Sequence, residues 1–287
     1  MLTQKKWLAP IILASLLALN ACQKSETTQN ANSGASEPTA TNTTIEFKAA
    51  TDAAYAPFEF QDTDGKLTGF SIEVLEAAGQ KAGFNIKMVQ KSWEGIFNSL
   101  DQGDIDIVAA SVTITDERKQ TMDFSDPYFE ATQLIAIKDD NTSVHSFNDL
   151  KDKTVSVQNG TTGDIVIQKL QGKTSTNIKR FESMPLALKE VAAGGVEASI
   201  GDFGVMENFV KNNPDIHLKT MMDNTFEKEF YGFAVKKGRP DLVAKINEGL
   251  KIIHDDGTYD EIYKKYFGEK KATAPSAQAA SAVLDTQ

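Results

Sequence analysis

Segments typical of β-strands and of α-helices alternate along most of this chain, in two successive series. The first series has strand-like patterns at residues 45–51, 84–89 and 105–112. Helix-like patterns lie between them, at residues 71–82 and in a short helix capped by Ser92 and ended by Gly103. This order predicts a mostly parallel sheet with helices on both faces.

The second series repeats the same order. Its strand-like segments are residues 154–157, 177–181 and 197–201, and its helix-like segments are residues 162–170, 184–193 and 203–211. Two further apolar segments flank this series, residues 131–137 before it and 230–235 after it. They predict a chain that leaves a first lobe, builds a second and returns.

The sequence therefore predicts an α/β protein with two lobes joined by two hinge strands. Lobe 1 comprises residues 45–130 and 231–268, with helices at 241–254 and 258–267, and lobe 2 comprises residues 131–230. A cleft between two such lobes faces the carboxyl ends of the strands, where α/β sheets usually bind ligands.

The amino terminus has the features of a targeting segment. Lys5 and Lys6 precede apolar residues 7–19, which fall short of the roughly 20 residues that span a bilayer. The segment ends in Leu-Asn-Ala-Cys at Cys22, a pattern similar to a bacterial lipobox, which implies cleavage before Cys22 and a lipid on it. An ordinary signal peptide with an incidental cysteine is the alternative. Residues 23–44 and 269–287 lack the apolar residues needed to order themselves, and we expect a linker and a disordered tail.

Composition excludes several classes of function. The formal net charge of −10 argues against nucleic acid or anionic lipid as the main partner. Cys22 is the sole cysteine, which excludes an intramolecular disulfide and a cysteine-based metal site or nucleophile. We expect a periplasmic or surface protein, anchored to the membrane through Cys22, without metal or cofactor.

Residues 113–128 narrow the function furthest. They follow an apolar strand pattern, and Arg118 lies just beyond the predicted strand end. A guanidinium beside free backbone donors at a strand-to-helix junction suits a small carboxylate. The segment therefore predicts an anion-binding site. Nothing near it suggests a reaction that breaks a bond. A solvated helix arginine is the alternative.

Five motifs in order support a family resemblance. They are residues 50–60, 69–70, 113–118, 123–128 and 256–267. With them, residues 45–268 resemble the polar amino-acid solute-binding proteins of ABC importers (family 3), the glutamine and lysine/arginine/ornithine binders among them. The resemblance implies the two-lobed type II periplasmic-binding-protein fold. It also implies a monomer that closes on an L-amino acid and presents it to a permease with a cytoplasmic ATPase.

The same resemblance assigns roles to individual residues. Arg118 would clamp the ligand α-carboxylate, with the hydroxyl or amide of Thr113 and the amide of Thr162. The carboxylate of Asp202 would accept from the α-ammonium, together with a carbonyl of Ala110 or Ser111 and the Ser111 hydroxyl. Asp202 has a second reading, which does not exclude the first, as the N-cap of the following helix.

The remaining residues would surround the ligand side chain. Tyr55 and Trp93 match the aromatic pair that sandwiches it, and ordinary core packing is the alternative. Asp52 and Gln158 would face its distal end, with Glu94 in support, and a carboxylate there disfavours acidic ligands. The glutamine binder carries lysine at the place of Gln158 and histidine at that of Gly201, so the expected ligand is arginine or another basic amino acid, then glutamine.

Two rival classes remain open. The same fold hosts dehydratases of the prephenate or arogenate type, and a sensor or adhesin lobe can keep an amino-acid site. Against catalysis, His145, His217 and His254 lie outside every motif, and no nucleophile–base pair is apparent. We therefore expect a binding protein and no enzyme.

Overall fold

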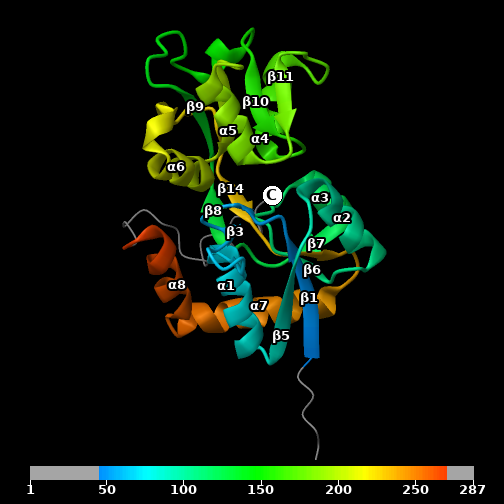
Figure 1. Cartoon of the computed structure of the whole chain (residues 1–287). Helices are drawn as coiled ribbons and strands as arrows, with labels where there is room; N and C mark the ends of the chain where they lie inside the picture. The colour runs from blue at the N-terminus through cyan, green and yellow to red at the C-terminus, as the bar shows by residue number, and fades with distance from the viewer. Residues whose placement is uncertain (1–44, 270–287) are drawn as a thin grey trace, which may run out of the picture. The chain divides into compact units, whose positions relative to one another are not determined.

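The computed structural model describes residues 45–269, and these fold into two sheet-containing lobes (Figure 1). The sheet of lobe 1 has the strand order β5-β1-β6-β15-β7, and the sheet of lobe 2 has the order β11-β10-β12-β9-β13. The predicted fold class is thereby confirmed. The predicted signal segment, Cys22, the linker and nearly all of the tail lie outside the described residues, and the lobe boundaries stay predictions.

The sheet of lobe 1 combines parallel and antiparallel pairing. Its strands are β1 (Ile45–Thr51), β5 (Phe84–Gln90), β6 (Ile107–Val108), β7 (Met122–Phe124) and β15 (Ala234–Lys236). β1 pairs in parallel with β5 and β6, whereas β15 pairs antiparallel with β6 and β7. β6 is much shorter than the predicted strand 105–112. The flanking Ile105 and Val112 are buried, so the apolar run predicted burial correctly but not the extent of pairing.

The sheet of lobe 2 has the same mixture. Its strands are β9 (Gln133–Lys138), β10 (Val155–Gln158), β11 (Ile178–Phe181), β12 (Ala198–Asp202) and β13 (Leu218–Met221). β10 pairs in parallel with β11 and β12, and β9 pairs antiparallel with β12 and β13. The expectation of mostly parallel sheets is therefore wrong for half of the pairings in each lobe.

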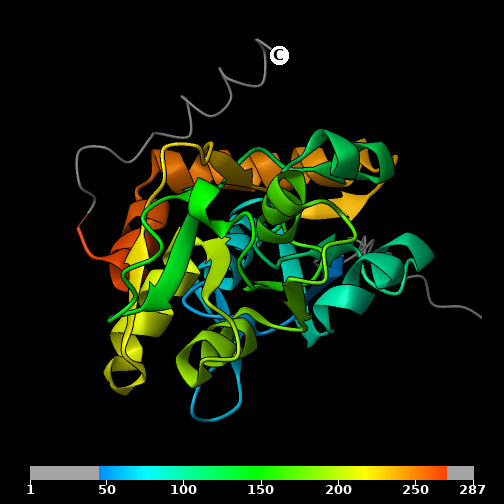
Figure 2. The ribbon, with the colours of Figure 1, turned by 90° about the horizontal axis from the view of Figure 1, so that it is seen from above.

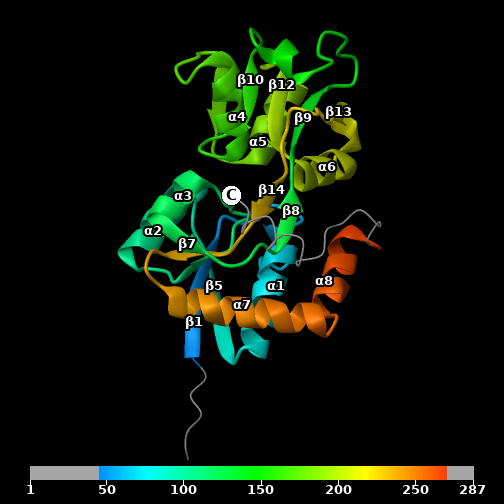
Figure 3. The same cartoon turned by 180° about the vertical axis from the view of Figure 1, so that it is seen from behind.

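The antiparallel strands arise from the segments predicted as crossings. The crossing itself is narrower: β8 (Phe129–Ala131) and β14 (Glu229–Tyr231) pair antiparallel between the lobes (Figure 3). The chain after β8 continues as β9 inside lobe 2, where Ile135 and Ile137 are buried in the core. The chain after β14 continues as β15 in lobe 1. An apolar run that covers both a crossing strand and the sheet strand after it does not show where the first strand ends and the second begins.

Helices cover both lobes. Lobe 1 carries α1 (Phe70–Lys81), α2 (Trp93–Gln102), α3 (Asp116–Thr121), α7 (Pro240–Asp255) and α8 (Thr258–Phe267), and lobe 2 carries α4 (Thr162–Gln171), α5 (Met184–Ala193) and α6 (Phe203–Asn212). The predicted opening of α1 by Ser71 is wrong, since the helix begins one residue earlier and Ser71 is buried, its hydroxyl bonded by that of Tyr128. Ser92 holds the N-cap position of α2 without a side-chain cap bond.

Three short strands and two 3-10 helices complete the fold. They are β2 (Ala54–Tyr55), β3 (Glu59–Gln61) and β4 (Leu67–Thr68), which form one small sheet, and the 3-10 helices Phe147–Leu150 and Pro214–Ile216. The small sheet leads from β1 into α1 and positions Tyr55 at the edge of lobe 1.

The core of lobe 1 requires a close approach of two helices. α7, orange in Figures 1 and 2, packs against α1, and Gly249 lies at the contact. A Cβ atom at this glycine would lie 2.1 Å from the Ala78 carbonyl oxygen. Only glycine allows that separation, so Gly249 determines how closely α7 packs on α1.

Candidate functional site

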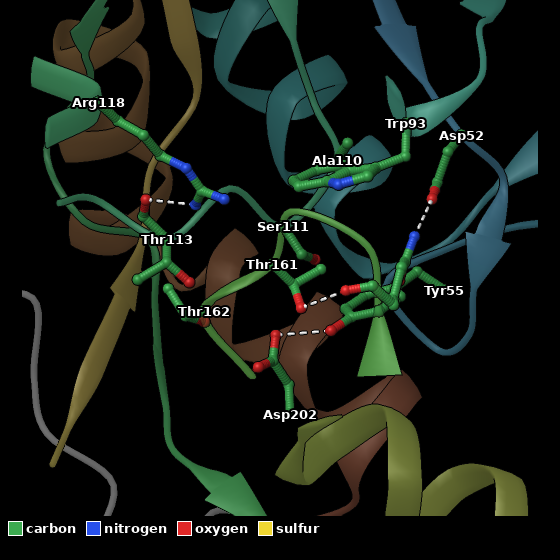
Figure 4. A pocket seen from close by; sticks show the side chains of 11 residues that line it. Asp52, Tyr55, Trp93, Ala110, Ser111, Thr113, Arg118, Thr161, Thr162 and Asp202 are labelled. Atoms are coloured by element: carbon green, nitrogen blue, oxygen red, sulfur yellow. Dashed lines mark hydrogen bonds between the residues drawn. The ribbon is translucent and has the colours of Figure 1, made fainter. Parts of the chain in front are cut away.

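One cavity between the two lobes collects all ten residues that the sequence assigned to ligand binding. Its lining residues are Asp52, Tyr55, Trp93, Ala110, Ser111, Thr113, Arg118, Gln158, Thr161, Thr162 and Asp202 (Figure 4). Thr161 is the one member that sequence reasoning did not name. The space among these side chains, including its mouth, is about 290 Å³.

The fold explains why residues so distant in sequence meet. Asp52 follows β1, Ala110 and Ser111 follow β6, Gln158 ends β10, and Asp202 ends β12. These are the carboxyl ends of the parallel strands in both lobes, which face one another across the cleft. Among the other lining residues, Trp93 begins α2, Thr161 caps α4 and Thr162 begins it, Arg118 lies on α3 and Tyr55 lies on β2.

Arg118 is held at the lobe 1 wall of the cavity. Its Nη1 donates to the Thr113 carbonyl at 2.8 Å, and its Nη2 donates to the Gly160 carbonyl of lobe 2 at 3.4 Å. The guanidinium also lies 5.6 Å from the Trp93 ring centroid and 5.8 Å from that of Phe97. Burial lowers the pKa of Arg118, while the charges of nearby carboxylates oppose that shift. An arginine in this setting stays charged and can bind a carboxylate.

Asp202 faces the cavity from lobe 2. Its carboxylate accepts hydrogen bonds from the hydroxyls of Tyr55 at 2.7 Å and Tyr231 at 2.5 Å, and from Gln133 Nε2 at 2.5 Å. It makes no side-chain cap bond to α6 although it holds the N-cap position, so the capping role is not observed. Burial raises the pKa of Asp202, and the three donors and Arg118 oppose the shift. A buried carboxylate of this kind suits a cationic partner.

The hydroxyls of Thr113 and Thr162 point at a residue that the sequence did not single out. Both donate to Glu229 Oε2, at 2.9 and 2.7 Å, and Gln133 Nε2 lies 3.0 Å from Glu229 Oε1. Burial and the negative charge of Asp202 raise the pKa of Glu229. With these hydroxyls engaged, the backbone amides of Thr113 and Thr162 are the groups left for a ligand carboxylate.

The opposite end of the cavity also joins the lobes. Gln158 Nε2 donates to Asp52 Oδ2 at 3.4 Å, and burial raises the pKa of Asp52. Trp93 Nε1 donates to the Asn159 carbonyl at 3.0 Å, and the Asn159 amide donates to Glu94 at 2.7 Å. Trp93 is 8% exposed, and one of its neighbours is Arg118. The Trp93 side chain therefore packs in the core of lobe 1 and also forms a wall of the cavity.

Ser111 adopts an unusual backbone conformation at the floor of the site. Its φ is 48°, in the left-handed region that non-glycine residues seldom adopt, and strain of this kind concentrates at functional sites. Its hydroxyl donates to Glu59 Oε1 at 2.7 Å. Burial raises the pKa of Glu59 well above its usual value. The Ser111 oxygen can still accept a hydrogen bond, whereas Ala110 contributes only backbone and a methyl group.

Four polar residues around the cavity were missed from the sequence: Glu59, Gln133, Glu229 and Tyr231. Two of them carried a signal, because Gln133 and Glu229 begin β9 and β14 and are polar beside apolar crossing segments. Glu59 carried none beyond its place in the first motif.

Two other kinds of feature are absent from the described part of the chain. Among residues 45–269 no group of three or more His, Cys, Asp or Glu side chains is arranged to hold a metal ion. In that same range no helix is long and apolar enough to cross a bilayer.

With the geometry established, comparison with known proteins defines the family. Residues 47–269 match the family model "Bacterial extracellular solute-binding proteins, family 3", and the chain belongs to this family. It is 38% identical over 274 residues to a probable histidine-binding protein of Neisseria gonorrhoeae, covering 95% of this chain and 99% of the relative. It is 31% identical over 273 residues to an arginine-binding extracellular protein of Bacillus subtilis, covering 93% and 100%.

Solved structures agree with this assignment. The chain is 43% identical to the arginine-, lysine-, histidine-binding protein ArtJ of Geobacillus stearothermophilus, with a TM-score of 0.76 over 79% of this chain and 97% of that one. It is also similar to the ancestral amino acid-binding protein AncCDT-1, a precursor of cyclohexadienyl dehydratase, at 37% identity and a TM-score of 0.69. That match covers 77% and 95% of the two chains. The family predicted from the motifs is thereby confirmed.

Proposed function

We propose that this protein is the substrate-binding component of an amino-acid ABC importer and captures a basic L-amino acid in the interlobe cavity. The observation that carries the proposal is the opposition of charges across that cavity. Arg118 lies on lobe 1, and Asp202 lies on lobe 2. This pair suits the α-carboxylate and α-ammonium of one zwitterion.

The preference for a basic ligand rests on the far end of the cavity. Asp52 lies there as a second, half-buried carboxylate, beside the amide of Gln158. A carboxylate in a low-dielectric site favours a cationic partner and disfavours a second carboxylate. One similar protein is named as a binder of arginine, and another as a binder of arginine, lysine and histidine, which agrees with this choice. Glutamine is the second candidate.

Capture proceeds by hinge closure. The ligand first docks on lobe 1, on Arg118 and the amide of Thr113, with Tyr55 and Trp93 along its side chain. Lobe 2 then brings Asp202 and the amide of Thr162, and bending concentrates at β8 and β14, the crossing between the lobes. The closed form is then presented to a membrane permease. A lipid on Cys22 would hold the protein at the membrane or cell surface.

A thermal-shift screen of the purified protein with the twenty amino acids, ornithine and cystine tests the proposal. We expect arginine, lysine, ornithine or histidine to raise Tm most, and acidic amino acids to leave it unchanged. No shift with any amino acid would refute capture, and the largest shift with glutamate would refute the role of Asp52. Turnover of prephenate or arogenate would instead support the dehydratase alternative.

A further inference from the structure

Glu229 occupies a central position that the proposed function leaves unexplained. It lies on β14, the returning crossing strand, and its carboxylate is bonded to groups from both lobes. Thr113 of lobe 1 and Thr162 of lobe 2 donate to its Oε2 at 2.9 and 2.7 Å. The side chain therefore lies directly behind the two residues whose amides are assigned to the ligand α-carboxylate.

Ligand entry would place two negative charges close together. The incoming α-carboxylate would meet Arg118 and the amides of Thr113 and Thr162, beside a Glu229 carboxylate bonded to the hydroxyls of those same threonines. Asp202 already adds a negative charge on the other side of Glu229, through the shared Gln133 amide. Like charges this near one another favour protonation of one of them.

The structure holds a hydrogen-bond acceptor that such a proton would satisfy. Gln133 is 1% exposed, and its Oε1 has no hydrogen-bond partner in the described part of the chain. Its Nε2 instead faces both carboxylates. Nε2 also donates to the Thr162 hydroxyl at 3.1 Å. When a ligand ammonium takes over the bond to Asp202, a turn of the Gln133 amide would exchange its remaining contacts and let Oε1 accept from a protonated Glu229.

We propose that Glu229 is a ligand-sensing residue of the binding site, whose carboxylate takes one proton from solvent when the α-carboxylate of an amino acid enters the cavity. This inference rests on the proposed function. The proton balances the charge that the ligand carboxylate adds, and it makes affinity depend on pH.

Other charges face Glu229 from several elements. Asp202 on β12 raises the pKa of Glu229, the donors Thr162, Thr113 and Gln133 lower it, and Tyr231 on the same strand is bonded to Asp202. Arg118 on α3 interacts with Glu229 through its charge.

Glu229 also lines a broad groove on the outer side of the two threonines, through which a proton can arrive from solvent. Charges of both signs line that groove, which leaves its net effect small: Lys119, Lys169, Lys228, Asp116, Glu117 and Glu227.

The sign of the effect follows from linkage. Ligand binding raises the pKa of Glu229 further, so affinity is highest at low pH and falls as pH rises through the pKa of the free protein, by up to tenfold per pH unit. Asp202 responds in the opposite sense, because a ligand ammonium lowers its pKa and releases a proton. Net uptake therefore identifies Glu229.

Calorimetry of the whole protein with L-arginine, or with the amino acid that gives the largest thermal shift, tests the proposal. Titrations between pH 5 and 7.5, each in two buffers of different ionisation enthalpy, give the number of protons taken up. We expect net uptake in the wild type and none in Glu229→Gln, together with an affinity about tenfold higher than wild type at pH 7.5. The control Glu227→Gln alters a neighbouring exposed acid and should match the wild type.

Two results would overturn the proposal: equal proton uptake in Glu229→Gln and the wild type, or a loss of affinity in the variant that is the same at every pH. The second would make Glu229 only a structural tie between the lobes. If the variant does not fold, the wild type is titrated with the ligand's amine analogue, which lacks the α-carboxylate and should cause no uptake. Absence of binding by any amino acid would refute the proposed function itself, whereas binding without proton uptake would refute only this inference.

Discussion

Replacement of Arg118 by alanine tests the core of the proposed site. The substitution removes the cation that lies against Trp93 and Phe97 and donates to carbonyl groups of both lobes. No other cationic residue is among those that line the cavity. A ligand α-carboxylate buried in the variant would therefore lack a counter-charge and keep only backbone donors.

The size of the loss follows from what the carboxylate gives up. A hydrogen bond to a charged group contributes about 1.5–3 kcal/mol, and truncating one partner of a buried charge pair costs about 2–5 kcal/mol. A bidentate clamp lies in the upper part of that range. A loss of about 3–4 kcal/mol corresponds to a dissociation constant roughly 100- to 1,000-fold higher. Arg118→Lys should recover only part of it, because an ammonium cannot form the planar two-bond contact.

Calorimetry with two ligands separates recognition from folding. The first ligand is the amino acid selected by the thermal-shift screen, and the second is the corresponding amine without its α-carboxylate. Arg118→Ala should weaken binding of the amino acid strongly and leave the weak binding of the amine nearly unchanged. Near-wild-type affinity for the amino acid, or an equal loss for both ligands, would refute the assignment of Arg118 to the α-carboxylate.

Three further predictions address other parts of the structure. Asp202→Asn should weaken amino-acid binding about 10- to 100-fold in calorimetry, because an amide cannot balance the α-ammonium; an unchanged dissociation constant would contradict this. For Glu59, burial raises the folded-state pKa, so the native state binds the extra proton and the free energy of unfolding falls as pH rises between the unfolded and folded pKa values. Glu59→Gln should remove this fall and raise the free energy of unfolding at pH 8 by at least about 1 kcal/mol in urea titrations, and no gain would argue that Glu59 is ionised. Gly249→Ala should lower the free energy of unfolding by about 1–3 kcal/mol because its Cβ would overlap the Ala78 carbonyl, whereas Glu248→Ala on the exposed face should change it by less than about 0.5 kcal/mol.

Local sequence patterns predicted most helices and the order of the elements. α5 (Met184–Ala193) and α8 (Thr258–Phe267) have the predicted limits, since Gly194 ends the former with a left-handed backbone and Gly257 precedes the latter. Strand limits were predicted less well, because an apolar run reports burial and not pairing. The run at residues 105–112 is buried along much of its length, yet only Ile107–Val108 pairs as a strand.

The direction of strand pairing was beyond local patterns. Whether β9 runs antiparallel to β12 depends on where the chain enters lobe 2, which is a property of the whole fold. The same limit applies to β13 (Leu218–Met221), a short edge strand whose pattern does not differ from that of a loop. Alternation of helices and strands therefore predicts two α/β lobes but not the strand order within them.

The residues of the site also divide into those that a local sequence pattern can predict and those that it cannot. Arg118 lies inside a recognisable motif and Asp202 lies at the end of a predicted strand, so the sequence could nominate them, and the fold then brings them to one cavity. Gln133 and Glu229 could not be nominated in this way, because each is a polar residue at the start of a strand, outside the motifs and next to other polar residues. Their significance arises only when the two crossings pair and place one amide nitrogen against two carboxylates.

This distinction has a consequence for ligand choice. In the proposed function, Arg118, Thr113 and Asp202 would recognise the groups that all α-amino acids share, so they would account for affinity toward the class and not for selection within it. Selection would then depend on the balance of charge at and around the cavity, where the carboxylates of Asp52, Asp202 and Glu229 outnumber the single cation of Arg118. A cationic ligand side chain offsets Asp52, and a proton on Glu229 offsets the ligand α-carboxylate. Neutralising Glu229 should therefore improve binding of basic and neutral amino acids by similar factors, whereas neutralising Asp52 should reduce the preference for basic ones.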